Sequence, residues 1–162
     1  MIGLDKLNQW LALVANIGVL VGIFFLVVEI NQNTAAIRIS TSQAMASEQA
    51  EFNRGFMDPD IARILVKVQE SGYPSLTPVE KLQLNGFDNT WLFVQQNNYY
   101  QFRAGALAPG DWAGRHWGIV DVFQTSENMR IHWQNRGQAF GDEFRAYIER
   151  DVLPLVGNLT KD

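Results

Sequence analysis

Histidines and carboxylates are the side chains of this sequence with the greatest capacity for chemistry. The 162 residues contain two histidines, His116 and His132, and each is followed by a tryptophan. A metal site on one helix needs ligands spaced as His-x-x-x-His or Glu-x-x-His, and neither pattern occurs in the sequence. The histidines could still meet in the fold near Asp111, Asp121 or Asp142, which keeps a shared metal site as the less favoured interpretation. We expect each histidine to lie at a helix surface with its ring hydrogen-bonded, and we predict no metal and no cofactor.

Motifs for covalent catalysis and phosphate binding are also missing from the sequence. There is no Gly-x-Ser-x-Gly, no Ser-x-x-Lys and no cysteine, and the segment Gly110–Gly114 lacks the lysine of a phosphate loop. Seventeen acidic and thirteen basic residues give a net charge of −4, which disfavours nucleic-acid binding. We therefore predict a protein that binds rather than catalyses and that has no nucleic-acid partner.

Tryptophans indicate where a binding surface could form. Aromatic residues at helical spacing usually belong to a core, but Trp112 and Trp117 flank His116 in a short segment rich in glycine. We expect this segment to be exposed and to contact a partner. Alternatively, Trp, His and Arg side chains could line a pocket for a small ligand. Arg136, three residues after Trp133, could be a buried arginine paired to a carboxylate.

The most distinctive element is a charge-free run near the N-terminus. Trp10–Val28 contains 19 residues without a charged side chain, and as a helix it would be about 28 Å long, close to the ~30 Å hydrocarbon core of a bilayer. The run is longer than the apolar core of a signal peptide, roughly 7–15 residues, and a soluble helix is rarely apolar on every side. We predict a short tail over residues 1–9 and a single transmembrane helix over residues 10–30, with a signal peptide or a buried soluble helix as the alternatives.

The middle of this run offers side chains that suit contact with another helix. Gly18 and Gly22 form a small-xxx-small pair that would let a second backbone approach closely. Asn16 lies about 200° around the helix from Gly18, and its amide needs a hydrogen-bonding partner in hydrocarbon. We predict that Asn16, Gly18 and Gly22 contact other membrane helices.

The rest of the chain shows only helical patterns. Apolar residues recur at spacings of three and four, and no segment alternates with period two. Asp58-Pro59 and Thr77-Pro78-Val79-Glu80 are typical helix starts. The expected fold class is all-α, with one N-terminal transmembrane helix followed by a bundle of five or six helices. The expected parts are a juxtamembrane helix over residues 31–57, a helical extramembrane domain over residues 58–156 and a flexible tail over residues 157–162.

A polar segment follows the apolar run at the depth of the lipid headgroups. Its hydrogen-bonding side chains are either a polar stop to the span or a docking surface, and Thr34 could cap a new helix if the chain bends there. The members of this juxtamembrane segment are Glu29, Asn31, Gln32, Asn33 and Thr34.

The same residues, read as Glu29-Ile30-Asn31-Gln32-Asn33-Thr34, resemble a motif of a widespread group of small bacterial membrane proteins. That group has a (Q/E)-I-R-Q-N-T motif after a single N-terminal span, a helical domain of this size and no established activity. Trp133-x-x-Arg136 and Phe140-x-x-x-Phe144 are similar to later parts of its pattern. The resemblance implies the same architecture, but Asn31 stands where the group has arginine, so the resemblance does not transfer the orientation in the membrane.

These features together predict a non-catalytic single-pass protein of the bacterial inner membrane that acts by protein–protein interaction. Its partners would be the lipid bilayer and either other membrane subunits, as an accessory or scaffolding subunit, or a second copy of itself. The alternative function is a membrane-tethered sensor with a Trp/His-lined pocket. Lys6 and Asp5 precede the span and Arg38 follows it, so the charges leave the side of the helical domain open.

Overall fold

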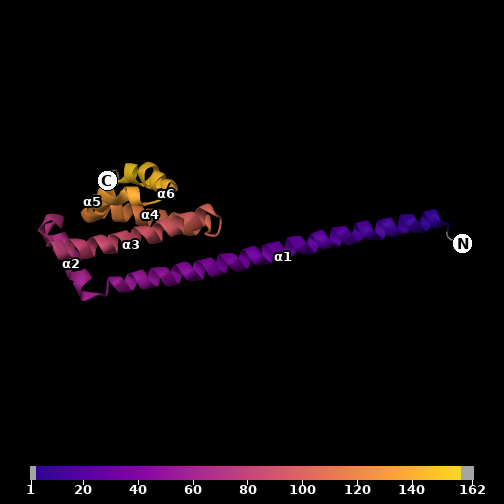
Figure 1. Ribbon diagram of the computed structural model, residues 1–162, viewed down its shortest axis with the longest axis horizontal. Coiled ribbons are helices and arrows are strands. Elements are labelled where there is room, and N and C mark those ends of the chain that lie inside the picture. The colour runs from indigo at the N-terminus through magenta and orange to yellow at the C-terminus, as the bar shows by residue number, and fades with distance from the viewer. Residues whose placement is uncertain (1–2, 158–162) are drawn as a thin grey trace. The chain divides into compact units, whose positions relative to one another are not determined.

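A helix of 52 residues, α1 (Leu4–Gly55), opens the structure. The computed structural model describes residues 3–157, and every regular element in this range is helical (Figure 1). The chain divides into two compact units between Ser40 and Thr41, which is inside α1. The predicted all-α class is therefore confirmed.

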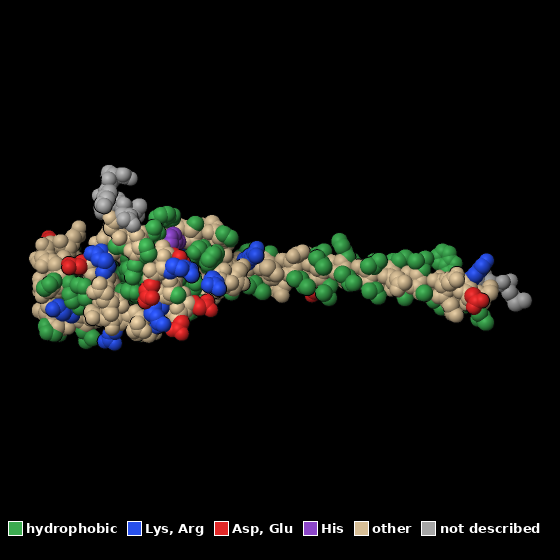
Figure 2. Space-filling view, turned by 90° about the horizontal axis from the view of Figure 1, so that it is seen from above, with side chains coloured by type: hydrophobic (Ala, Val, Ile, Leu, Met, Phe, Trp, Pro, Cys, Tyr) green, Lys and Arg blue, Asp and Glu red, His purple; other side chains and the backbone are tan. Residues whose placement is uncertain are grey.

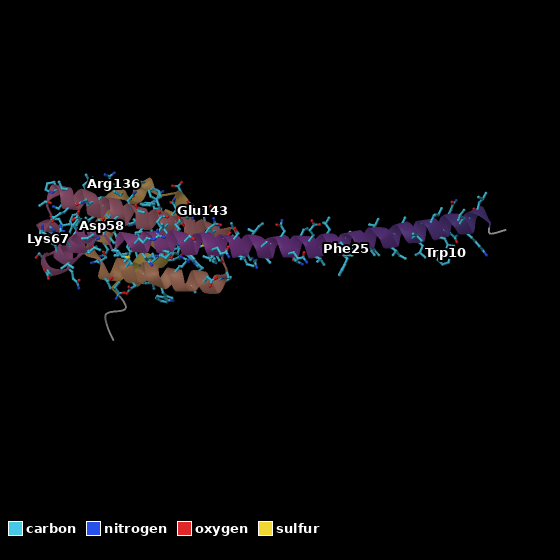
Figure 3. The ribbon with its side chains drawn as sticks, turned by 90° about the horizontal axis from the view of Figure 1, so that it is seen from below. Trp10, Phe25, Asp58, Lys67, Arg136 and Glu143 are labelled. Atoms are coloured by element: carbon cyan, nitrogen blue, oxygen red, sulfur yellow. The ribbon has the colours of Figure 1, made fainter. Side chains whose placement is uncertain are left out.

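The first unit is the N-terminal part of α1, whose apolar run packs against nothing within the described residues. Every residue from Trp10 to Val27 is exposed, and the side chains of Trp10 and Phe25 project away from the helix (Figure 3). Hydrophobic side chains cover much of its visible face (Figure 2). By length and composition, this helix is able to cross a membrane.

The boundaries of α1 differ from the expected ones at two places. The helix begins at Leu4, so residues 4–9 are helical rather than a tail, because Leu, Lys and Gln are good helix formers. It continues through Thr34, which starts no second helix, because Ala35 and Ala36 extend the same favourable run. The separate juxtamembrane helix is thus the second half of α1. Of the expected flexible tail, only Gly157 lies among the described residues.

The second unit contains the last turns of α1 and five further α-helices, which agrees with the expected five or six. The N-caps explain where three of them begin: Asp58 accepts from the backbone N–H of Asp60, Thr77 and Glu80 form a reciprocal capping box, and Ser126 accepts from Met129. The elements are α2 (Pro59–Ser71), a 3₁₀ turn (Tyr73–Ser75), α3 (Pro78–Arg103), α4 (Pro109–Thr125), α5 (Glu127–Arg136), a 3₁₀ turn (Gly137–Ala139), α6 (Asp142–Tyr147), a π-helical turn (Ile148–Val152) and a 3₁₀ turn (Leu153–Leu155).

Helix α3 is the central element of the second unit. It lies between the C-terminal part of α1 and the helices α4–α6 (Figure 1). Leu92 of α3, Phe123 of α4 and Phe144 of α6 are fully buried in the main hydrophobic core. On the other side, Phe52 of α1 stacks on Phe87 of α3 with ring centroids 4.7 Å apart. The second unit therefore buries an apolar core made only of its own residues.

Candidate functional site

The three residues expected to contact other membrane helices lie exposed on α1. A methyl group added at Gly18 or Gly22 would meet no atom within 4 Å, so both positions are open to an approaching backbone. Asn16 is exposed, and its side chain makes no hydrogen bond within the described residues. Within the described residues, the Asn16 amide and the helix face that carries Gly18 and Gly22 therefore have no contact with another element.

The juxtamembrane segment is also open on α1. All five of its predicted contact residues are exposed, and none of their side chains forms a hydrogen bond or an ion pair within residues 3–157. These residues are Glu29, Asn31, Gln32, Asn33 and Thr34. Such a surface is available to lipid headgroups or to another protein.

The Trp112–Trp117 segment forms part of α4, and of its two tryptophans only Trp117 is exposed as expected. Trp117 is 53% exposed and its ring packs edge-on against His116 at 5.5 Å. The expectation that Trp112 is exposed is wrong: this side chain is 8% exposed. The reason is that α4 turns Trp112 toward α3, where its ring stacks on Phe102 with centroids 5.0 Å apart and planes 8° from parallel.

Trp112 and His116 line an open groove of about 520 Å³, named here the α4 groove. His116 Nδ1 lies 2.8 Å from the hydroxyl oxygen of Tyr147, in a hydrogen bond whose direction depends on the imidazole tautomer. Burial, with smaller contributions from Asp151 and Tyr99, raises the pKa of Tyr147, so this phenol stays neutral. The groove is lined by Tyr99, Phe102, Arg103, Trp112, Ala113, His116, Tyr147, Arg150 and Asp151.

Two arginines lie on the rim of the α4 groove. Arg103 donates to the Tyr99 hydroxyl at 3.0 Å and lies 3.7 Å from a carboxylate oxygen of Glu143. Arg150 donates two hydrogen bonds to Asp151, at 2.8 and 2.7 Å, which hold the pKa of that carboxyl below its ordinary value. Aromatic walls and guanidinium groups can hold a planar molecule with a carboxylate. Sequence reasoning missed both arginines, because their spacing gives no sign that α3 and the π-helical turn share a groove.

His132 and Arg136 lie in environments that differ from the expected ones. His132 is 4% exposed and therefore buried rather than at a surface, with Nδ1 3.4 Å from Oδ1 of Asn85 and no partner for Nε2. Burial, and secondly Arg136, lowers its pKa. Arg136 is exposed at the edge of the second unit (Figure 3) and forms no ion pair within the described residues. The two histidines do not share a partner, and no group of three or more metal-binding side chains occurs in residues 3–157.

A buried carboxylate is the feature that sequence reasoning missed most completely. Asp88 is 3% exposed, and its Oδ2 accepts a hydrogen bond of 2.8 Å from Asn128, whose own Oδ1 accepts one of 2.7 Å from Ser126. Burial raises its pKa from 3.8 to about 6, against a smaller opposing effect of Asn128. The sequence carried a signal, since Asp88 stands at the middle position of the stripe Leu84-x-x-x-Asp88-x-x-x-Leu92, where an apolar residue is expected.

Comparisons with models of protein families, with curated proteins and with solved structures found no match for this chain. Its function is therefore inferred from its own residues and their arrangement.

Proposed function

We propose that this chain is a non-catalytic single-pass membrane protein that acts by binding other proteins. The support is the contrast between the two units: the second buries its apolar residues in its own core, whereas the run from Trp10 to Val27 stays exposed on all sides. A continuous apolar surface of this kind is unfavourable in water and is stable in lipid. The resemblance of the juxtamembrane segment to a bacterial group supports the bacterial inner membrane as the location.

The single observation that carries the binding role is the unpartnered amide of Asn16 in the middle of the apolar run. Lipid tails cannot hydrogen-bond with this amide, whereas a polar group or backbone carbonyl of a neighbouring helix can. Gly18 and Gly22 add a second face on which a helix backbone can come close. Two contact faces suit a helix placed between neighbours, either other subunits of a membrane complex or further copies of this chain.

The test is purification of the full chain in mild detergent, with the mass of the complex and the identity of its components as readouts. We expect Gly18→Ile and Asn16→Leu each to reduce recovery of the partner. The matched control is Phe24→Ala, which changes side-chain size on a third face about 240° from Gly18. Because a Cβ atom at position 18 would meet no atom within 4 Å and the helix is exposed there, a loss of assembly would report the contact with a partner. A lone monomer from the unchanged chain, or full recovery with both variants, would contradict the proposal.

The α4 groove favours a second candidate function, a membrane-tethered sensor of a small ligand. Its specific support is that Trp112, His116 and Arg103 line one groove. Benzoate, a planar carboxylate, is a suitable probe, and we expect saturable quenching of tryptophan fluorescence that Arg103→Gln weakens. Quenching that is equally strong in the Arg103→Gln variant would count against this candidate.

A further inference from the structure

A second pocket, named here the Asp88 pocket, lies where five elements of the second unit meet, and it shares no lining residue with the α4 groove. Its volume is about 180 Å³. An apolar cavity of ~150 Å³ is large enough to hold benzene, so this pocket accepts a group of that size. It is lined by Phe52 of α1, Phe56 in the turn after α1, Leu65 of α2, Phe87, Asp88 and Trp91 of α3, Val122 of α4, and Ser126, Asn128 and Met129 at the start of α5.

Aromatic rings form much of the wall. Phe56, in the turn after α1, packs edge-on against Phe52 at 5.3 Å and against Phe87 at 4.8 Å, so three rings form one corner of the pocket. Trp91 is partly buried against the main core and also lines the pocket, and it makes no ring contact with another aromatic side chain in the described part of the chain. Phe56 is 47% exposed and Ser126 is half-buried, which places the entrance beside these two residues.

Asp88 contributes the one charged group of this lining. It accepts one hydrogen bond, from Asn128, and no basic side chain within residues 3–157 forms an ion pair with it. Burial raises the pKa of Asp88, the Asn128 hydrogen bond opposes that rise, and no neighbouring charge contributes. A buried carboxylate without a cation is costly, and a cation bound beside it would remove that cost.

We propose that the Asp88 pocket binds a small quaternary ammonium group, with the aromatic rings around the cation and Asp88 as its counter-charge. Aromatic faces attract cations, most strongly at tryptophan. A quaternary ammonium has no N–H donor, so it needs only the counter-charge of Asp88 and the aromatic wall, whereas a primary ammonium has three N–H donors to satisfy. Calcium and magnesium need about six oxygen ligands, which this apolar lining does not offer.

This inference is independent of the proposed membrane contact, because every lining residue belongs to the second unit. It assigns a ligand to the extramembrane domain whatever the membrane helix binds. A failure to find a partner in detergent and a failure to bind a quaternary ammonium are therefore separate results.

The test is calorimetric titration of the full chain in non-ionic detergent with choline, and with its neutral isostere 3,3-dimethyl-1-butanol. We expect saturable binding of choline and at least about tenfold weaker binding of the alcohol, because only the cation is attracted by the rings and by Asp88. At pH 5 about one-tenth of Asp88 is ionised when its pKa is about 6, so choline affinity should fall about tenfold between pH 7.5 and pH 5.

Two variants and one matched control complete the design. Asp88→Asn keeps an acceptor for Asn128 but removes the charge, and it should weaken choline binding and reduce the preference for choline over the alcohol to the part that the aromatic rings supply. Phe56→Leu removes an aromatic ring from the pocket wall at a position that is 47% exposed and outside the buried core. This variant should fold, and it should bind choline severalfold more weakly. Asp121→Asn removes a carboxylate from an exposed position of α4 and should change nothing. Equal binding of choline and the alcohol, unchanged binding in Asp88→Asn, or no saturable binding would each overturn the proposal.

Discussion

Replacing Asp88 by asparagine should change how the stability of the helical domain depends on pH. Burial raises the pKa of Asp88 from 3.8 to about 6, so the folded state holds this proton more tightly than the unfolded state does. The carboxylate therefore lowers the free energy of unfolding above pH 6, and this loss disappears as the pH falls below 3.8. At 1.36 kcal/mol per pKa unit, its full size is about 3 kcal/mol.

Asparagine does not titrate, so the variant should lack this dependence. We expect the stability of Asp88→Asn minus that of the unchanged chain to increase by about 2–3 kcal/mol between pH 4 and pH 7.5. Any constant effect of the amide on the Asn128 hydrogen bond is the same at both pH values and cancels. The assay is urea unfolding of both full chains in non-ionic detergent, followed by near-ultraviolet circular dichroism at a series of pH values. A difference that stays constant with pH, or that decreases toward pH 7.5, would refute the assignment of a raised pKa to Asp88.

Three further substitutions test the packing and the helix ends by the same unfolding assay. Phe144→Ala should lower the free energy of unfolding by about 3–5 kcal/mol because this ring is fully buried, and a loss below 1 kcal/mol would contradict its place in the core. Thr77→Ala removes the capping box of α3 and should lower it by about 1 kcal/mol, whereas no change would mean that the cap is not formed. Gly72→Ala should lower it by about 1–2 kcal/mol because φ is +76° there. Its control, Gly114→Ala inside α4, should raise it by up to about 1 kcal/mol, and equal effects at both glycines would argue against the turn.

Local signals in the sequence predicted the helices well. Asp58 and Thr77 cap helices at the expected positions, because a side-chain cap depends only on residues two or three positions away. The charge-free run from Trp10 likewise predicted a long apolar helix, since length and composition are properties of the sequence itself. What depends on neighbours in the chain could therefore be anticipated.

The burial of single side chains depends on contacts between helices that are distant in the sequence, so it was predicted less well. Trp112 is buried because α3 brings Phe102 against it, and His132 is buried beside Asn85, 47 positions earlier. Asp88 was overlooked for a different reason: its polar type suggested a surface position, although its spacing placed it on the apolar stripe of α3. Polar residues on apolar stripes are thus the signal by which a buried functional group can be found before a structure exists.

The crossing of a membrane by α1 is the central claim and has a direct test. Because the chain contains no cysteine, single cysteines can be introduced on each side of the apolar run, as Leu4→Cys and Gln43→Cys, both at exposed positions. The full chain is produced in a bacterial host, and a membrane-impermeant maleimide is added to intact spheroplasts and, in parallel, to lysed ones. We expect one of the two cysteines to react in intact spheroplasts and the other to react only after lysis. Reaction of both cysteines in intact spheroplasts, or of neither before lysis, would contradict a single membrane crossing.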